Sequence, residues 1–266
     1  MEWTEGQTVY LSIPFTWLLP MAYSRCIWLQ SEGYRVKAGG PAVTLMPQYL
    51  SGLAEYGSYS DAVARHNPDA MFTSRGCIRR CDFCAVWRTE GQFAELDQWP
   101  SRPIICDNNL LACSRRHFDK VIDSLKGLKS VDFNQGLDAR LLKPEHAARI
   151  AELDISMVRL AWDDTRLELQ FMHAVEILNQ AGFSNRHIQA YVLFGFRDTP
   201  SDALYRCETL KSRGIRANPQ RYQPLDSLAK NSYVSPGWTE RELRRFGRYW
   251  ARQNWLSKIP YAEYRG

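Results

Sequence analysis

Three cysteines lie close together in the segment Cys77-Ile-Arg-Arg-Cys81-Asp-Phe-Cys84, with the spacing C-x3-C-x2-C. A loop with thiols at this spacing can wrap one soft metal centre. Thiolates are the ligands that iron–sulfur clusters prefer, and three of them on a four-iron cluster leave one iron free to bind a further ligand. The spacing therefore predicts a 4Fe-4S cluster held by Cys77, Cys81 and Cys84, with one iron open to chemistry.

A structural zinc site is the main alternative for the same thiols. Zinc normally takes four protein ligands, most often from two separated cysteine pairs or from two cysteines and two histidines. The chain has no second C-x2-C pair, so His66, Cys106 or Cys113 would have to complete the tetrahedron. Three unrelated buried thiols are a further alternative.

Six short apolar runs alternate with amphipathic segments between residues 69 and 225, which indicates strands alternating with helices. Such strands pair in parallel through right-handed crossovers, in a barrel or a doubly wound sheet. We expect an α/β fold with a partial (β/α)6 barrel of the TIM type, whose active site lies at the C-terminal strand ends. The predicted strands are Met71–Arg75, Ile104–Cys106, Val131–Asn134, Met157–Ala161, Ile188–Phe194 and Ile215–Tyr222.

Helix starts are marked by capping residues. Ser114 can cap a helix that Gly127 ends, and Thr199-Pro200 supplies a cap and a first-turn proline for another. Thr239 and Glu242 form a capping box for a third helix, which is rich in arginine. We expect this last helix to pack on the barrel with its arginines facing water, as a C-terminal helical cap within residues 226–266.

The region before the barrel, residues 1–68, predicts a short β-α-β extension. Residues 8–15 favour a strand, Trp17–Gly33 a helix and Tyr34–Ala38 a second strand. The remainder to residue 68 is rich in Gly, Ser and Pro, and we expect an irregular connection there.

Composition is that of an ordinary globular protein. The chain has 266 residues, 45% of them hydrophobic and 24% charged, with a net charge of +5. The first residues lack the basic segment of an export signal, and no apolar run is long enough for a membrane span. Seven cysteines, an odd number with three close together, favour a reducing compartment and metal or redox use. We therefore expect a cytoplasmic protein without a membrane partner.

The segment CIRRCDFC, placed after a strand at the start of a six-strand alternating region, resembles the radical S-adenosylmethionine superfamily. The resemblance covers about residues 69–225. It implies that S-adenosylmethionine binds the open iron and is cleaved reductively to methionine and a 5'-deoxyadenosyl radical. It also implies an oxygen-sensitive enzyme and an electron donor such as flavodoxin or ferredoxin. By the same resemblance, Phe83 would lie against the adenine.

Residues after the second and third predicted strands match positions that contact the cofactor in this family. Asp107 could pair with the methionyl ammonium and Asn108 could offer amide contacts, or both could form a polar turn that caps the next helix. After the third strand, Gln135 lies in a polar strand end, and Arg140 could pair with the cofactor carboxylate. A structural salt bridge is the alternative for Arg140.

Residues after the later strands extend the resemblance. Asp163 could bind the ribose hydroxyls and Trp162 could line the substrate cavity, although a structural salt bridge explains Asp163 equally well. Gly195 and Phe196 are similar to the family's fifth-strand motif beside adenine, where glycine allows close approach. The sixth strand ends Arg221-Tyr222-Gln223-Pro224, similar to the proline-bearing strand of some branches, or it is a simple strand end.

Residues 8–41 resemble a shortened form of the cobalamin-binding domain that precedes the barrel in one branch of the superfamily. The cobalamin-ligating motif D-x-H-x-x-G is absent, however, which argues against a cobalamin cofactor. We expect a degenerate remnant packed on the barrel. The scattered Cys26, Cys106, Cys113 and Cys207 fit buried hydrophobic positions, although one of them could donate hydrogen to a radical.

Three functions agree with these residues. The first is a radical enzyme that abstracts hydrogen from a nucleic-acid base or nucleotide, which tryptophans and tyrosines beside arginines in the C-terminal stretch would suit. The second is a radical enzyme acting on a small metabolite or peptide. The third is a zinc-stabilised binding protein without turnover. Salt-sensitive binding to nucleic acid would separate the first two.

Overall fold

Alternating apolar and polar residues begin the chain and form its first sheet. In β2 (Thr8–Ser12), Val9 and Leu11 are buried while the other three residues are partly exposed.

The structure, a computed structural model, describes residues 1–57, 62–252 and 258–266. It divides the chain into two units, the first made of residues 1–70, 79–93 and 223–233 and the second of residues 71–78, 94–222 and 234–266. The division at residues 68 and 225 stays a prediction.

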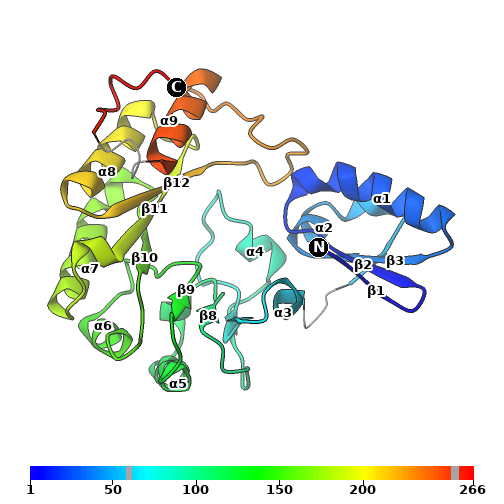
Figure 1. Ribbon diagram of the computed structural model, residues 1–266, viewed down its shortest axis with the longest axis horizontal. Helices are drawn as coiled ribbons and strands as arrows, with labels where there is room; N and C mark the ends of the chain where they lie inside the picture. The colour runs from blue at the N-terminus through cyan, green and yellow to red at the C-terminus, as the bar shows by residue number, and fades with distance from the viewer. Residues whose placement is uncertain (58–61, 253–257) are drawn as a thin grey trace. The chain divides into compact units, whose positions relative to one another are not determined.

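The first unit contains the predicted β-α-β motif. Strand β2 pairs in parallel with β3 (Arg35–Gly39), and α1 (Leu19–Ser31) connects them and packs against β3 (Figure 1). Leu19, Cys26 and Leu29 of α1 are buried in the core of this unit. The sheet order is β1-β2-β3-β4, with β1 antiparallel and β4 parallel to their neighbours.

The stretch expected to be irregular contains short elements. The remaining elements of the unit are β1 (Glu2–Glu5), α2 (Pro41–Leu45), β4 (Glu55–Tyr56), α3 (Ala62–His66) and α4 (Val86–Thr89). Helix α4 packs against α2.

The second unit contains a strand at each of the six predicted positions, with α-helices between the later ones. Strands β8 and β9 are parallel, as are β10 with β11 and β11 with β12. The sheet orders are β5-β8-β9 and β10-β11-β12, and an isolated parallel bridge joins Leu137 to Leu160. These strands are β5 (Ala70–Met71), β8 (Ile104–Ile105), β9 (Asp132–Phe133), β10 (Val158–Ala161), β11 (Ile188–Phe194) and β12 (Arg216–Arg221).

The fold is thus mixed α/β, and the described residues form several small sheets and no closed barrel. The predicted first strand is divided into β5 and β6 (Ser74–Arg75). Strand β6 pairs antiparallel with β7 (Ala94–Glu95). Pro219 lies in β12, where it is tolerated because this strand pairs on one side only.

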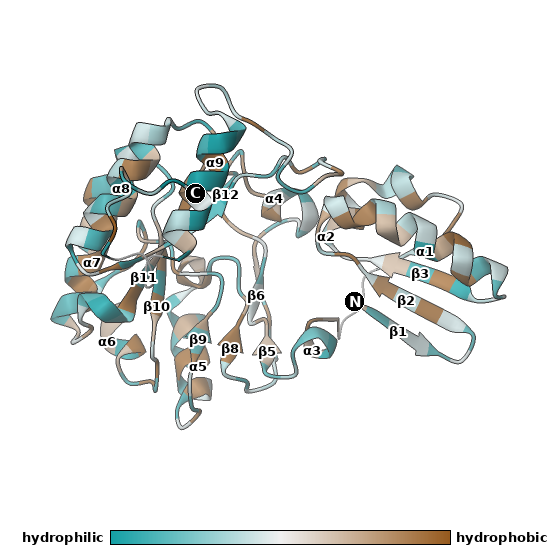
Figure 2. Cartoon of the chain, turned by 45° about the horizontal axis from the view of Figure 1, so that its top comes forward, coloured by the Kyte–Doolittle hydropathy of each residue, from teal (hydrophilic) through white to brown (hydrophobic). Residues whose placement is uncertain are grey.

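Helices pack their apolar faces onto these strands. Helix α8 contacts β11 and β12, and α9 contacts β12. Figure 2 shows the apolar colour on β8 and β10 and the polar colour along much of α9. The helices of this unit are α5 (Arg115–Leu125), α6 (Pro144–Ile150), α7 (Glu168–Gln180), α8 (Pro200–Ser212) and α9 (Glu240–Ala251). None of the described helices is both long and apolar enough to cross a membrane.

The predicted caps are confirmed. The hydroxyl of Ser114 accepts a hydrogen bond from the backbone N–H of His117. Thr199 with Asp202 and Thr239 with Glu242 form complete capping boxes. The expectation that the arginines of α9 face water is wrong for Arg245, whose guanidinium donates to backbone carbonyls of residues 261, 262 and 264.

Candidate functional site

Cys77 follows β6 and is partly exposed. Gly76 directly before it has φ 75°, a left-handed conformation that favours glycine. Because β6 pairs with β7, the backbone that leads to Cys77 is part of a two-stranded antiparallel ribbon.

Asp107 fixes the same segment from β8. Its carboxylate, 3% exposed, accepts hydrogen bonds from the backbone N–H of Thr73 at 2.6 Å and from Ser74 Oγ at 2.8 Å. It also accepts a bond from the hydroxyl of Thr73. Both carboxylate oxygens thus bind the chain just before Cys77, while the contact of Asp107 with a methionyl ammonium stays a prediction.

Asn109, which follows β8, contacts Cys77. Its side chain is buried, and Nδ2 lies 3.6 Å from Cys77 Sγ and 3.3 Å from Asp138 Oδ2. Asn109 Oδ1 and the neighbouring Asn108 Nδ2 are buried and have no hydrogen-bond partner among the described residues. Sequence reasoning singled out Asn108 in this polar run and missed Asn109 and Asp138.

Arg140 makes the salt bridge that was the alternative for it. Its Nε and Nη2 donate to the two oxygens of Asp138 at 2.6 and 3.0 Å. Asp138 therefore receives a guanidinium on one side and the amide of Asn109 on the other. Gln135 is exposed in the turn after β9.

Asp163 follows β10, and its Oδ1 accepts the backbone N–H of Leu193 in β11 at 3.1 Å. Burial raises the pKa of this carboxyl, while the Leu193 N–H and the positive charges of Arg206 and Arg140 act in the opposite direction. A carboxyl that keeps its proton more readily than usual can donate as well as accept a hydrogen bond. Trp162 beside it is fully buried and stacks on Phe171, so the expectation that it lines a substrate cavity is wrong.

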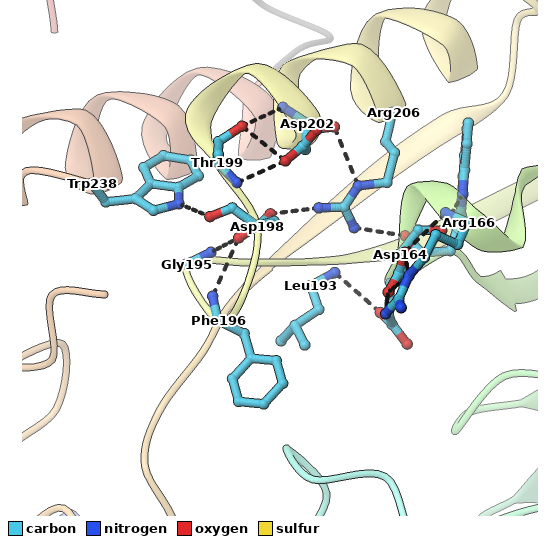
Figure 3. Close-up of polar contacts among 12 residues, drawn as sticks. Asp164, Arg166, Leu193, Gly195, Phe196, Asp198, Thr199, Asp202, Arg206 and Trp238 are labelled. Carbon is cyan, nitrogen blue, oxygen red and sulfur yellow. Dashed lines mark hydrogen bonds and ion pairs between the residues drawn. The ribbon is translucent and has the colours of Figure 1, made fainter. Parts of the chain in front are cut away.

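Gly195 and Phe196 begin the loop after β11 (Figure 3). Both backbone N–H groups donate to Asp198 Oδ1, at 2.8 and 3.3 Å. Gly195 has φ 72°, and a Cβ there would lie 2.7 Å from Leu243 Cδ2 of α9. Its close approach to adenine stays a prediction. The ring of Phe196 lies 4.6 Å from that of Tyr222.

Arg206 joins the ends of β10 and β11. Its fully buried guanidinium donates to Asp198 Oδ2 at 2.5 Å and to the carbonyl of Trp162 at 3.0 Å (Figure 3). Burial raises the pKa of Asp198 although Arg206 acts to lower it. Sequence reasoning missed Arg206, because nothing in the spacing distinguishes it from an exposed helix residue.

The other two cysteines of the motif lie in the first unit, where α4 follows them. The backbone N–H of Cys84 donates to the carbonyl of Cys81 at 3.0 Å, and Trp87 Nε1 donates to the same carbonyl at 3.1 Å. Cys81, Phe83 and Cys84 are all partly exposed. Among the described side chains, no three His, Cys, Asp or Glu residues are gathered as a metal-binding group.

The remaining cysteines largely occupy the expected buried positions. Cys26, Cys106 and Cys207 are buried, whereas Cys113 is partly exposed. Burial raises the pKa of the Cys26 thiol to about 11 and that of Cys113 to about 12. None of the seven cysteines is in a disulfide.

The raised pKa of Asp163 gives a pH-dependent stability. The folded state binds this proton more tightly than the unfolded state, so stability falls as pH rises from the ordinary value of 3.8 through the folded value. Asp163→Asn removes this loss, because the amide keeps an acceptor oxygen without a charge. In thermal unfolding, we expect the midpoint temperature of the variant to rise relative to that of wild type as pH increases from about 4 to about 7.

Asp154→Asn is the matched control, because Asp154 is exposed and pairs with Lys129 on the surface. Its difference from wild type should not show the same rise toward neutral pH. A pH-independent difference for Asp163→Asn would contradict the burial of its charge.

No protein-family model matches this chain, and no curated protein matches it.

Proposed function

We propose that the protein is a radical S-adenosylmethionine enzyme with a 4Fe-4S cluster on Cys77, Cys81 and Cys84. The observation that carries this proposal is the C-x3-C-x2-C motif at the end of the first of six predicted strands. The short segment from Cys77 to Cys84 keeps the three thiols within reach of one cluster. We also propose that the two parallel sheets, joined by the Leu137–Leu160 bridge, are the two halves of a partial six-stranded barrel.

The chemistry of the residues near Cys77 fits such a cluster. None of the three cysteines is in a disulfide, and the amide of Asn109 offers Cys77 Sγ a donor. The buried, unpartnered amide atoms of Asn108 and Asn109 are polar groups that a bound group can satisfy. When bound, the cluster supplies the electron that cleaves S-adenosylmethionine to the radical that abstracts hydrogen.

In this proposal, the chain's own residues hold the segments around the cluster and orient the cofactor. Asp107 fixes the segment before Cys77, and Arg206 fixes the strand ends beside Asp163. Asp163 and Arg140 are our candidates for binding the polar groups of the cofactor, and Phe83 and Phe196 for contacting its adenine. Because the cluster keeps one iron open, we expect it to be destroyed by oxygen. We propose a cytoplasmic enzyme served by an electron donor such as flavodoxin or ferredoxin.

Metal analysis tests this proposal against the zinc alternative. After anaerobic reconstitution with iron and sulfide, we expect about four irons per chain and visible iron–sulfur absorbance. A protein that holds one zinc and takes up no iron would support the zinc-stabilised binding protein.

A nucleic acid is the substrate class that the surface of α9 favours. Arg241, Arg244, Arg248 and Arg252 are exposed and recur at helical spacing, so they form one stripe. Arg244 pairs with Glu240, whereas Arg241, Arg248 and Arg252 have no ion pair within the described ranges. Guanidinium groups suit phosphates, which they bind through two parallel hydrogen bonds.

The triple variant Arg241→Gln, Arg248→Gln, Arg252→Gln is therefore expected to weaken binding to single-stranded RNA or DNA. Each lost phosphate contact should reduce the slope of log affinity against log salt by about 0.7, a total of about 2. Fluorescence anisotropy with a labelled oligonucleotide at several salt concentrations measures this slope.

The matched control removes three other exposed charges, at Lys129, Arg186 and Arg213. This control should bind nearly as wild type. Equal losses in both triple variants, or salt-insensitive binding by wild type, would favour a small metabolite or peptide as the substrate.

A further inference from the structure

The amide of Asn109 lies between two acceptors, the sulfur of Cys77 and the carboxylate of Asp138. Only 4% of this residue is exposed, and its Nδ2 faces Cys77 Sγ at 3.6 Å and Asp138 Oδ2 at 3.3 Å. An amide nitrogen has two N–H groups, so it can serve both acceptors. The amide of Asn109 is thus a polar contact to a cysteine sulfur of the motif within the second unit.

The chemistry of the neighbours fixes the orientation of this amide. If the side chain were flipped, Oδ1 would lie against the carboxylate of Asp138, and two acceptors would then repel each other. Asp138 is itself held by Arg140, which donates to both of its oxygens. The sequence of contacts from Arg140 through Asp138 to Asn109 therefore keeps an N–H directed at Cys77.

We propose that Asn109 is a positioning residue that sets the reduction potential of the cluster through its hydrogen bond to Cys77. This inference rests on the proposed function, because it requires a cluster bound through Cys77. Reduction adds one negative charge, which the cluster shares with its sulfur ligands. A donor to a ligand sulfur stabilises the reduced state and raises the potential, and outer groups of this kind commonly tune metal sites.

Asn109→Leu tests the proposal, because leucine has a similar size and no donor. The readout is the midpoint potential of the reconstituted full chain, titrated anaerobically without S-adenosylmethionine and followed by electron paramagnetic resonance. We expect reduction to become about tenfold less favourable, which is a shift of about 59 mV to a more negative potential for one electron. Asn109→Gln restores an N–H donor and should return the potential toward the wild-type value.

Asn179→Leu is the matched control, since the amide of Asn179 donates to the carbonyl of Phe183 at the end of α7, away from the cysteine motif. Its potential should equal that of wild type. If Asn109→Leu does not load iron, Asn109→Ala is the second donor-free variant and is judged by the same shift.

The outcomes separate this inference from the proposed function. An unchanged potential in a fully loaded donor-free variant overturns the role of Asn109 and leaves the cluster in place. The same shift in Asn179→Leu also overturns it, because a general disturbance of the second unit would then explain both. A wild-type chain that takes up no cluster overturns both proposals.

Discussion

Cys81→Ala is expected to abolish formation of the iron–sulfur cluster while the protein stays folded. Two thiolates cannot replace three on a cluster that needs one cysteine for each protein-bound iron. The local backbone should persist, because Cys81 contributes its carbonyl to Cys84 and Trp87, and alanine keeps that carbonyl. Iron content should fall from about four per chain to near zero, with the thermal midpoint almost unchanged.

Cys113→Ala is the matched control, because Cys113 is also a partly exposed cysteine outside any disulfide but lies outside the motif. This variant should load iron as wild type does. Normal loading of Cys81→Ala, or equal loss in Cys113→Ala, would be incompatible with the proposed set of ligands.

Arg206→Met is expected to destabilise the second unit by about 3–5 kcal/mol. The substitution leaves Asp198 partly buried without its guanidinium partner, and it removes the donor to the carbonyl of Trp162. Urea unfolding followed by circular dichroism measures the loss. The double variant Arg206→Met, Asp198→Asn should recover part of it, because the unpaired charge is then gone.

Arg213→Met is the control for this effect, since Arg213 is exposed just after the same helix. Its change should stay within about 0.5 kcal/mol. A loss of that small size for Arg206→Met would mean that the buried ion pair does not hold the ends of β10 and β11 together.

Local patterns predict most of the second unit. Buried strands such as Ile188–Phe194 are short runs of apolar residues. Helix starts are marked by Ser114, Thr199 and Thr239, each of which accepts a hydrogen bond from the backbone N–H three residues further along the chain. The sequence does not predict β1, because Glu2–Glu5 is largely exposed and mostly polar, and only its pairing with β2 makes it a strand. That pairing is a tertiary contact that periodicity does not contain.

The candidate site is likewise predictable from the sequence only in part. The cysteine spacing and the polar strand ends are visible in sequence, because each lies within one short segment. Contacts between segments are not visible, and they include those of Asn109 with Cys77 and Asp138 and those of Arg206 with Asp198 and Trp162. Arg206 occupies a helix position where a charge normally faces water, and only two acceptors supplied by other parts of the chain stabilise it when buried.

Formation of 5'-deoxyadenosine tests the central claim most directly. The reconstituted full chain is reduced with dithionite under anaerobic conditions in the presence of S-adenosylmethionine, and the product is followed by mass spectrometry beside Cys81→Ala. The proposed function predicts 5'-deoxyadenosine from wild type and none from Cys81→Ala. A fully loaded wild-type cluster that forms no 5'-deoxyadenosine, with nucleotides, oligonucleotides or peptides added as substrates, would contradict it.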